Sequence, residues 1–118
     1  MTMQCTRVPA EGHAHFKLTG PSELAELKRL LAKIGQDSGA LALRKLLLDL
    51  LDVEGDLSMG ERYELGVATA EALAGFGKIA VVQLGRVHRG FAALVANNRG
   101  ARINIFTEVA PALAWLQA

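Results

Sequence analysis

Four carboxylates crowd one short stretch of the chain, and carboxylates at close spacing suggest a cation site. They are Asp49, Asp52, Glu54 and Asp56. In a calcium-binding loop the ligands alternate and a glycine occupies the sixth position, and this spacing does not match. We therefore interpret the stretch as a solvated acidic turn and expect no metal there. Asp49 is the exception, because a carboxylate inside an apolar strand must find hydrogen-bond donors or lie at the strand end.

A serine follows the acidic stretch at the start of a predicted helix. Ser58-Met59-Gly60-Glu61 has the spacing of a capping box. A capping serine contributes about 1 kcal/mol, because its hydroxyl accepts an otherwise unpaired backbone N–H. Phosphate on Ser58 would meet the helix N-terminus favourably, but Asp56 and Glu61 would repel its charge. We interpret Ser58 first as a helix cap and second as a candidate phosphorylation site.

A basic loop, Gly85-Arg-Val-His-Arg-Gly90, offers a different chemistry. Its cationic side chains, Arg86, His88 and Arg89, precede a helix at the expected carboxyl end of a parallel strand. Open α/β sheets bind ligands at that end, and helix N-termini attract anions. The loop is thus a candidate anion-binding site, with a solvated loop as the alternative.

Other reactive side chains match no catalytic or metal template. His13 and His15 lie two apart on a strand, but no third ligand is placed with them, so we expect a solvated face. Gly75-Phe-Gly-Lys78 lacks the earlier glycine and the following Ser or Thr of a P-loop. Cys5 has no histidine obviously near it. We expect no catalytic residue, no cofactor and no enzyme activity.

The totals narrow the class of protein. The chain has 118 residues, 51% of them hydrophobic and 21% charged, which fits one folded domain over residues 1–118. A net charge of +1 argues against a nucleic-acid partner. One cysteine, no N-terminal apolar run and no stretch of ~20 apolar residues predict a cytoplasmic protein without a membrane span.

The hydrophobic pattern alternates between strands and helices. An amphipathic helix opens at residues 19–22, with Pro21 in its first turn, and ends at Gly35; residues 36–39 follow as a loop. The last helix has Ala110 at its cap and Pro111 at its first position. The predicted strands cover residues 3–8, 13–18, 46–51, 78–84 and 102–106, and two further helices start at residues 58 and 91.

This order, ββαβαβαβα with four helices, predicts an α/β fold. Alternating strands and helices imply a mixed, mostly parallel sheet with right-handed crossovers, and the N-terminal hairpin adds an antiparallel edge. Residues 46–51 form too continuous an apolar run for a half-exposed strand, so we expect a central strand covered on both faces.

The order of elements and several short motifs resemble the SpoIIAA-like proteins, small bacterial relatives of the STAS domain. The resemblance covers nearly the whole chain and implies the STAS/SpoIIAA-like fold. It includes a terminal Phe-x-x-x-x-x-Ala-x-x-Trp-Leu pattern. The residues that carry it are Leu48-Asp49-Leu50, Leu57-Ser58, Ala80-Val81-Val82, Ala96-Asn97-Asn98-Arg99-Gly100, Ile105-Phe106 and Ala112-Leu113-Ala114-Trp115-Leu116.

In the phosphoregulated antagonists of that family, a partner kinase phosphorylates a serine at a helix N-terminus and thereby breaks binding. Ser58 and Gly60 fall where the serine and glycine of that motif would stand. Leu57 and Met59 depart from its Asp-Ser-Ser-Gly or Asp-Thr-Ser-Gly pattern. The resemblance therefore implies a phosphorylation-switched anti-sigma factor antagonist as one alternative.

Our first functional hypothesis is a non-enzymatic regulatory or protein-interaction module that binds a protein partner, a second copy of itself, or both. Its surface would be the loop 53–58 and the following helix, with contacts from Val53, Asp56, Leu57, Met59 and Tyr63. The alternative is a carrier or sensor of a small apolar or anionic, lipid-like ligand held between sheet and helices. An internal cavity would favour the ligand, and an exposed apolar patch would favour interaction.

Overall fold

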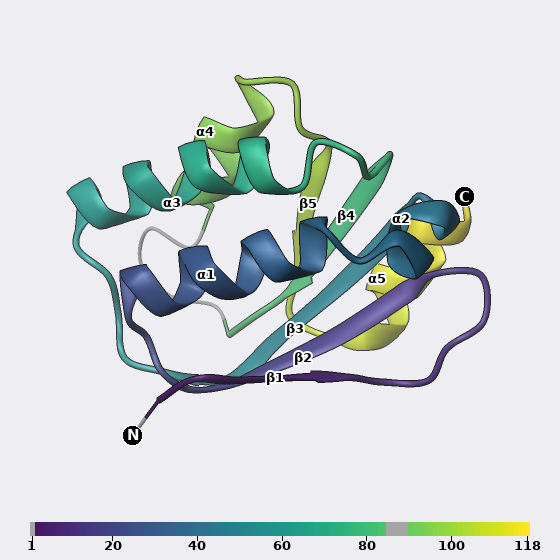
Figure 1. The fold of residues 1–118 in the computed structure, drawn as a ribbon, viewed down its shortest axis with the longest axis horizontal. Coiled ribbons are helices and arrows are strands. Elements are labelled where there is room, and N and C mark those ends of the chain that lie inside the picture. Colours follow the sequence, from purple (N-terminus) through teal and green to yellow (C-terminus); the bar gives the residue numbers. More distant parts are fainter. Residues whose placement is uncertain (1, 85–89) are drawn as a thin grey trace.

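The computed structural model describes residues 2–84 and 90–118. A five-stranded sheet runs through the molecule in the order β1-β2-β3-β4-β5, so each strand lies beside its neighbour in the chain (Figure 1). β1 and β2 are antiparallel, and the remaining pairs are parallel. The strands are β1 (Gln4–Arg7), β2 (Ala14–Pro21), β3 (Lys45–Glu54), β4 (Lys78–Val82) and β5 (Ile103–Phe106).

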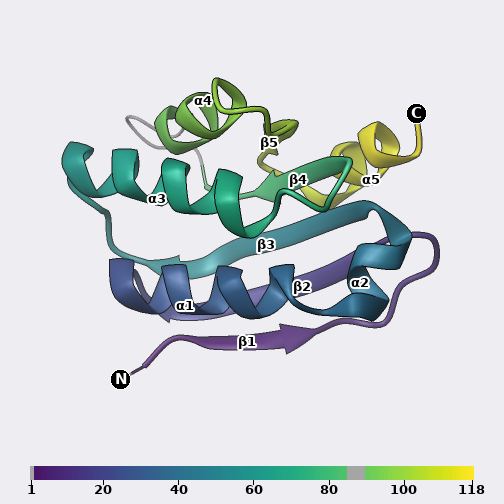
Figure 2. The same cartoon turned by 45° about the horizontal axis from the view of Figure 1, so that its top comes forward.

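The helices cover the two faces of the sheet unequally. Figure 2 shows α1, α3 and α4 on one face and α5 on the other, with α2 at the end of the sheet where β3 begins. The three helices that connect parallel strands share one face, as they must when crossovers of one hand run in one direction along a sheet. The helices are α1 (Leu24–Gly35), α2 (Ser38–Leu43), α3 (Met59–Ala72), α4 (Phe91–Asn97) and α5 (Val109–Gln117).

β3 is the central strand that the apolar run predicts. Leu46 and Leu48 are buried in the larger core beneath α1 and α3. Leu47 points to the opposite face and is buried with Ala112 and Leu116 of α5. Burial on both faces confirms the prediction and explains why the run has no polar alternation.

The junction of β2 and α1 differs from the prediction. Pro21 is the last residue of β2 and pairs with Glu54, rather than opening the helix. A proline is tolerated at a strand end because its missing N–H removes no bond from the middle of the ladder. The cap of α1 is Glu23, whose carboxylate accepts hydrogen bonds from the backbone N–H groups of Ala25 and Glu26, each at 3.1 Å.

The described chain contains five helices, so the prediction of four was wrong. Residues 36–39 were expected to be a loop, but Asp37 caps the short helix α2 by accepting the N–H of Ala40 at 3.0 Å. Arg44 ends this helix in the left-handed region with φ of 63°. The observed order is ββααβαβαβα. Six residues are too few to establish a helical period in the sequence.

The final helix begins earlier than predicted. Its N-cap is Glu108 and its first residue is Val109, so Pro111 occupies the third position and Ala110 is not the cap. Proline is accepted there because the first N–H groups of a helix have no partner within it. Lys78 of β4 stabilises the other end, where its ammonium donates to the carbonyl oxygens of Trp115 at 3.0 Å and Ala118 at 2.9 Å.

Candidate functional site

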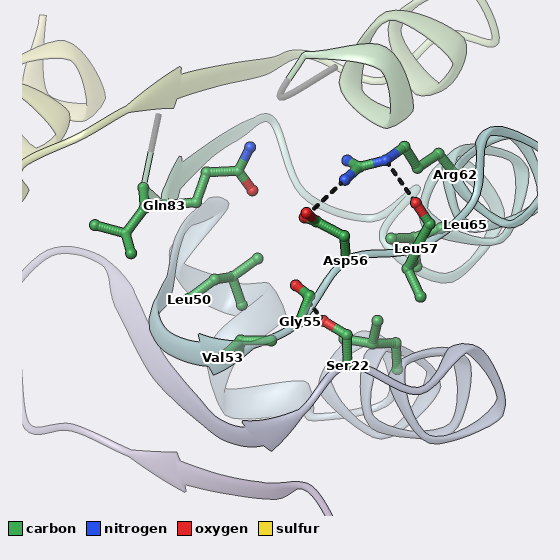
Figure 3. Close-up of a pocket in the computed structure, with 11 residues that line it drawn as sticks. Ser22, Leu50, Val53, Gly55, Asp56, Leu57, Arg62, Leu65 and Gln83 are labelled. Atoms are coloured by element: carbon green, nitrogen blue, oxygen red, sulfur yellow. Dashed lines mark hydrogen bonds and ion pairs between the residues drawn. The ribbon is translucent and has the colours of Figure 1, made fainter. Parts of the chain in front are cut away.

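A hollow of about 110 Å³ lies at the carboxyl ends of β2, β3 and β4, beside the N-termini of α1 and α3 (Figure 3). This is the end of an open parallel sheet at which ligands and partners most often bind. Its walls are largely apolar. The apolar lining residues are Leu27, Leu50, Val53, Leu57, Leu65 and Leu84, and the polar ones include Ser22, Asp56, Arg62 and Gln83.

An ion pair closes one side of the hollow. The Arg62 guanidinium lies 3.1 Å from the Asp56 carboxylate, and Arg62 Nε donates to the Leu57 carbonyl oxygen at 3.1 Å. In Figure 3 the two charged groups face each other on one side of the hollow, and Leu50 and Val53 lie on another side of it. The Arg62 side chain is only 14% exposed, whereas that of Asp56 is 56% exposed. Arg62 therefore ties the acidic loop to α3, and Asp56 presents its charge to solvent.

The acidic loop is also tied to the end of β2. The backbone N–H of Ser22 donates to the Glu54 carbonyl oxygen at 2.7 Å. The Ser22 hydroxyl reaches the carbonyl of Gly55 at 3.5 Å, and Gly55 itself has φ of +80°, a conformation that costs glycine little. These bonds fix the start of the loop, and the contacts of Arg62 with Asp56 and Leu57 fix its end, so the hollow is built into the fold.

Ser58 is the helix cap that its spacing predicts. Its hydroxyl accepts the N–H of Glu61 at 3.1 Å, and the Glu61 carboxylate accepts the N–H of Ser58 at 2.9 Å. Both halves of the capping box are present, which satisfies two N–H groups. The Glu61 carboxylate consequently stands next to the hydroxyl that a kinase would modify. Phosphorylation of Ser58 stays a prediction.

The five predicted interaction residues fall into two adjoining groups. Val53, Asp56 and Leu57 line the hollow. Met59 and Tyr63 are 42% and 48% exposed and lie one turn apart on α3, so their side chains are neighbours on its surface. The Tyr63 hydroxyl accepts a hydrogen bond of 3.2 Å from Arg99, which lies just after α4.

Several lining residues were not predicted from the sequence. Ser22 and Gln83 lie just beyond β2 and β4, and the rule that sites form at the carboxyl ends of neighbouring parallel strands would have indicated both. Leu27 and Leu65 gave no such signal, because on a helical stripe they are indistinguishable from core residues. Arg62 was likewise missed. The anion-binding prediction for Arg86, His88 and Arg89 falls outside the described residues.

The acidic side chains of β3 and the following loop have separate partners. Asp49 is buried, and its carboxylate accepts the N–H of Leu51 at 3.0 Å, which supplies the donor that the sequence requires. This bond sits where the register of β3 against β2 slips, the irregularity of a β-bulge. Asp52 pairs with Lys17 at 2.8 Å. Within residues 2–84 and 90–118, no three His, Cys, Asp or Glu side chains group in a way that would hold a metal ion.

The prediction of a solvated face is wrong for His13. Its side chain is buried, with Nδ1 3.2 Å from the carbonyl oxygen of Glu11, and it lies just before β2, where the alternation of the strand does not apply. His15 is partly buried, and burial lowers its pKa below the usual 6.5. Burial likewise raises the pKa of the Cys5 thiol, and this cysteine is free.

Two further spaces bear on ligand binding. A cavity of about 80 Å³ between the sheet and α1, α3 and α4 shares Leu27, Leu50 and Leu65 with the hollow. It is smaller than the ~150 Å³ that admits benzene in an engineered core. A groove of about 470 Å³ lies between β1 and α1, with Met3, Phe16 and Leu30 among its apolar residues and Lys33 among its charged ones.

These features define a SpoIIAA-like α/β fold, as the sequence predicts. One similar solved structure is an anti-sigma factor antagonist from Mycobacterium paratuberculosis, with a TM-score of 0.69, 19% identity and coverage of 99% of this chain and 96% of that one. Another is an uncharacterized DUF3478-family protein with a SpoIIAA-like fold from Shewanella loihica PV-4, with a TM-score of 0.58, 17% identity and coverage of 98% and 94%. No family model and no curated protein sequence matches the chain.

These identities establish a shared fold and no more than that. Among the described residues, no helix is both long enough and apolar enough to cross a bilayer.

Proposed function

We propose that this protein is a non-enzymatic regulatory module that binds another protein. Its binding surface is the loop 53–58 together with the start of α3. The observation that carries the proposal is the exposure of Met59 and Tyr63 on one side of α3, directly after that loop. Methionine and tyrosine are enriched at protein interfaces, and the shared fold with an anti-sigma factor antagonist supports the same class of role.

Site-specific photo-crosslinking tests this surface. A Tyr63→p-benzoylphenylalanine variant, irradiated in lysate of the source organism, should form a discrete adduct with one protein. The matched probe is Ala114→p-benzoylphenylalanine, exposed on α5 on the opposite face of the sheet, which should not form that adduct. Equal adducts from both positions, or none from position 63, would contradict the proposal.

A charge introduced on the surface sharpens the test. Adding Met59→Lys to the Tyr63 probe should remove the adduct, because it places an ammonium group in the apolar contact. Leu43→Lys is the matched control, since Leu43 is a similarly exposed apolar residue, at 36%, on the distant helix α2. Loss of the adduct in both variants would point to a general effect on the protein and count against this surface.

Phosphorylation of Ser58 would act on this surface directly. The hydroxyl lies between the residues of the loop and Met59, and a phosphate there would add negative charge beside Asp56 and Glu61. We propose it as a switch that weakens partner binding. Incubation with ATP and host lysate, followed by phosphosite mapping, tests the proposal, and absence of label at Ser58 would reject it.

The groove between β1 and α1 favours a second candidate function, the binding of an anionic amphiphile. Its volume lies within the ~300–1,000 Å³ typical of small-molecule sites. Met3, Phe16 and Leu30 offer apolar contacts, and Lys33 offers a positive charge. The other charged lining residues have partners, since Arg29 pairs with Glu26 at 2.7 Å and Asp37 with Arg7 at 3.2 Å. Calorimetric titration with decanoate should show saturable binding that Lys33→Gln weakens. Lys28→Gln, on the same helix outside the groove, should leave it unchanged, and an absence of saturable heat would dismiss this function.

A further inference from the structure

We infer that the partner inserts one aliphatic side chain into the hollow at the end of β3, with a basic residue beside it. The inference rests on the proposed function and specifies what the partner must present. It concerns the hollow itself rather than the exposed side chains of α3.

The size of the hollow selects the kind of side chain. A cavity of ~150 Å³ holds one benzene molecule, so about 110 Å³ is the scale of a single side chain and suits a branched aliphatic group. The walls suit the same group, because Leu27, Leu50 and Leu65 come from three different elements and converge on the space. A leucine or isoleucine would fill it without burying a polar atom.

The hollow is already formed in the free protein. The Arg62–Asp56 ion pair and the bond from Ser22 to Glu54 hold the loop that forms its mouth. A preformed pocket that receives one side chain at the centre of an interface is the arrangement in which few residues supply most of the binding energy. Ordering the loop in advance lowers the entropic cost of association.

The charges of the described residues around the mouth are mostly negative. Glu54 lies between two lining residues and is exposed, and the lining residue Asp56 carries a second carboxylate. Asp56 is 56% exposed, whereas the Arg62 side chain beside it is 14% exposed and already engaged. A cationic residue next to the aliphatic one in the partner would complement this field, and an acidic one would be repelled.

Short peptides test the inference without knowledge of the partner. The probes are the capped tripeptides acetyl-Lys-Leu-Lys-amide, acetyl-Lys-Ala-Lys-amide and acetyl-Glu-Leu-Glu-amide, titrated into the ¹⁵N-labelled full chain. The first should shift the amide signals of Leu50, Val53 and Leu65, and the other two should bind at least about tenfold more weakly. Equal binding of the leucine and alanine peptides, or shifts confined to other residues, would overturn the inference.

Filling the hollow provides the complementary test. Val53→Phe should abolish the response to acetyl-Lys-Leu-Lys-amide while leaving a dispersed spectrum. If that variant does not fold, Leu57→Phe fills the space from the loop. A peptide response that survives filling in a folded variant would also overturn the inference.

The crosslinking probe at position 63 separates the two proposals. If Met59→Lys removes the adduct and a folded variant with a filled hollow keeps it, the proposed binding surface is correct and the inserted aliphatic side chain is wrong. If the variant with a filled hollow reduces the yield of adduct at least about tenfold, the insertion of an aliphatic side chain is supported. If no adduct forms and no peptide binds, both proposals fail.

Discussion

Gly66 of α3 and Ala92 of α4 approach so closely that a Cβ atom at position 66 would lie 2.6 Å from the Ala92 carbonyl oxygen. The same Cβ would stand 2.7 Å from the Cβ of Val95. Neither neighbour is a flexible side-chain end, so the helices would have to separate. The missing side chain at Gly66 therefore sets the distance between α3 and α4.

Gly66→Ala should consequently destabilise the protein by about 1–2 kcal/mol. Overpacking costs about 1–3 kcal/mol, and alanine returns up to ~1 kcal/mol through its higher helix propensity. Urea unfolding followed by circular dichroism measures the difference. Gly60→Ala is the control on the same helix, because a Cβ there meets nothing within 4 Å, and it should be neutral or stabilising. Equal effects at the two positions would contradict the close approach.

Removing the hydroxyl of Ser58 tests its structural role. Ser58→Ala should lower the free energy of unfolding by about 1 kcal/mol, because the N–H of Glu61 loses its acceptor. Ser58→Asp should retain most of the stability, since aspartate caps as well as serine. The same urea series measures both variants, and an alanine variant as stable as the parent would show that the capping box contributes nothing.

His15 should make stability depend on pH. Burial lowers its pKa below 6.5, with Lys17 and His13 adding to the effect and Asp49 opposing it. Below pH 6.5 the unfolded chain binds the proton more readily than the folded one, so stability is full above that pH and falls as the pH drops. The His15→Gln variant should lose this part of the decline between pH 8 and pH 5. Identical slopes of unfolding free energy against pH in both proteins would rule out a contribution from His15.

Lys78 should hold the C-terminal helix in place. Its ammonium donates to the carbonyls of Trp115 and Ala118 and lies 5.2 Å from the centre of the Trp115 ring. Lys78→Met keeps the length of the side chain and removes these interactions, so amide exchange in α5 should accelerate relative to that in α1. Lys28→Met, at an exposed position of α1, is the control and should leave amide exchange in α5 unchanged. Unaltered exchange in α5 of the Lys78 variant would refute the role.

The sequence correctly predicts those elements whose residues follow a strong repeating pattern. The apolar run of β3, the stripe of α1 and the capping box at Ser58 all lie where the pattern places them. The short helix α2 gave no periodic signal, and Pro21 is compatible with both a strand end and a helix start. The structure extends β2 to Pro21 through its pairing with Glu54, a residue distant in the chain, and starts α1 after Glu23.

The candidate site was predictable where its residues belong to one continuous segment of the chain. Val53, Asp56 and Leu57 belong to one continuous segment, and the order of elements places that segment at the end of the sheet. Leu27 and Leu65 reach the hollow from two helices, and only the packing of α1 and α3 on the sheet brings them there. His13 shows the opposite failure, because it lies just before β2 and is buried although the alternation predicted an exposed side chain.

The agreement between strand order and chain order has a consequence for folding. Neighbouring strands in the sheet are also successive in the sequence, so each strand after the first pairs with the strand synthesised before it. All the residues described as lining the hollow lie between Ser22 and Leu84. The part of the chain that lines the hollow is therefore synthesised before β5 and α5.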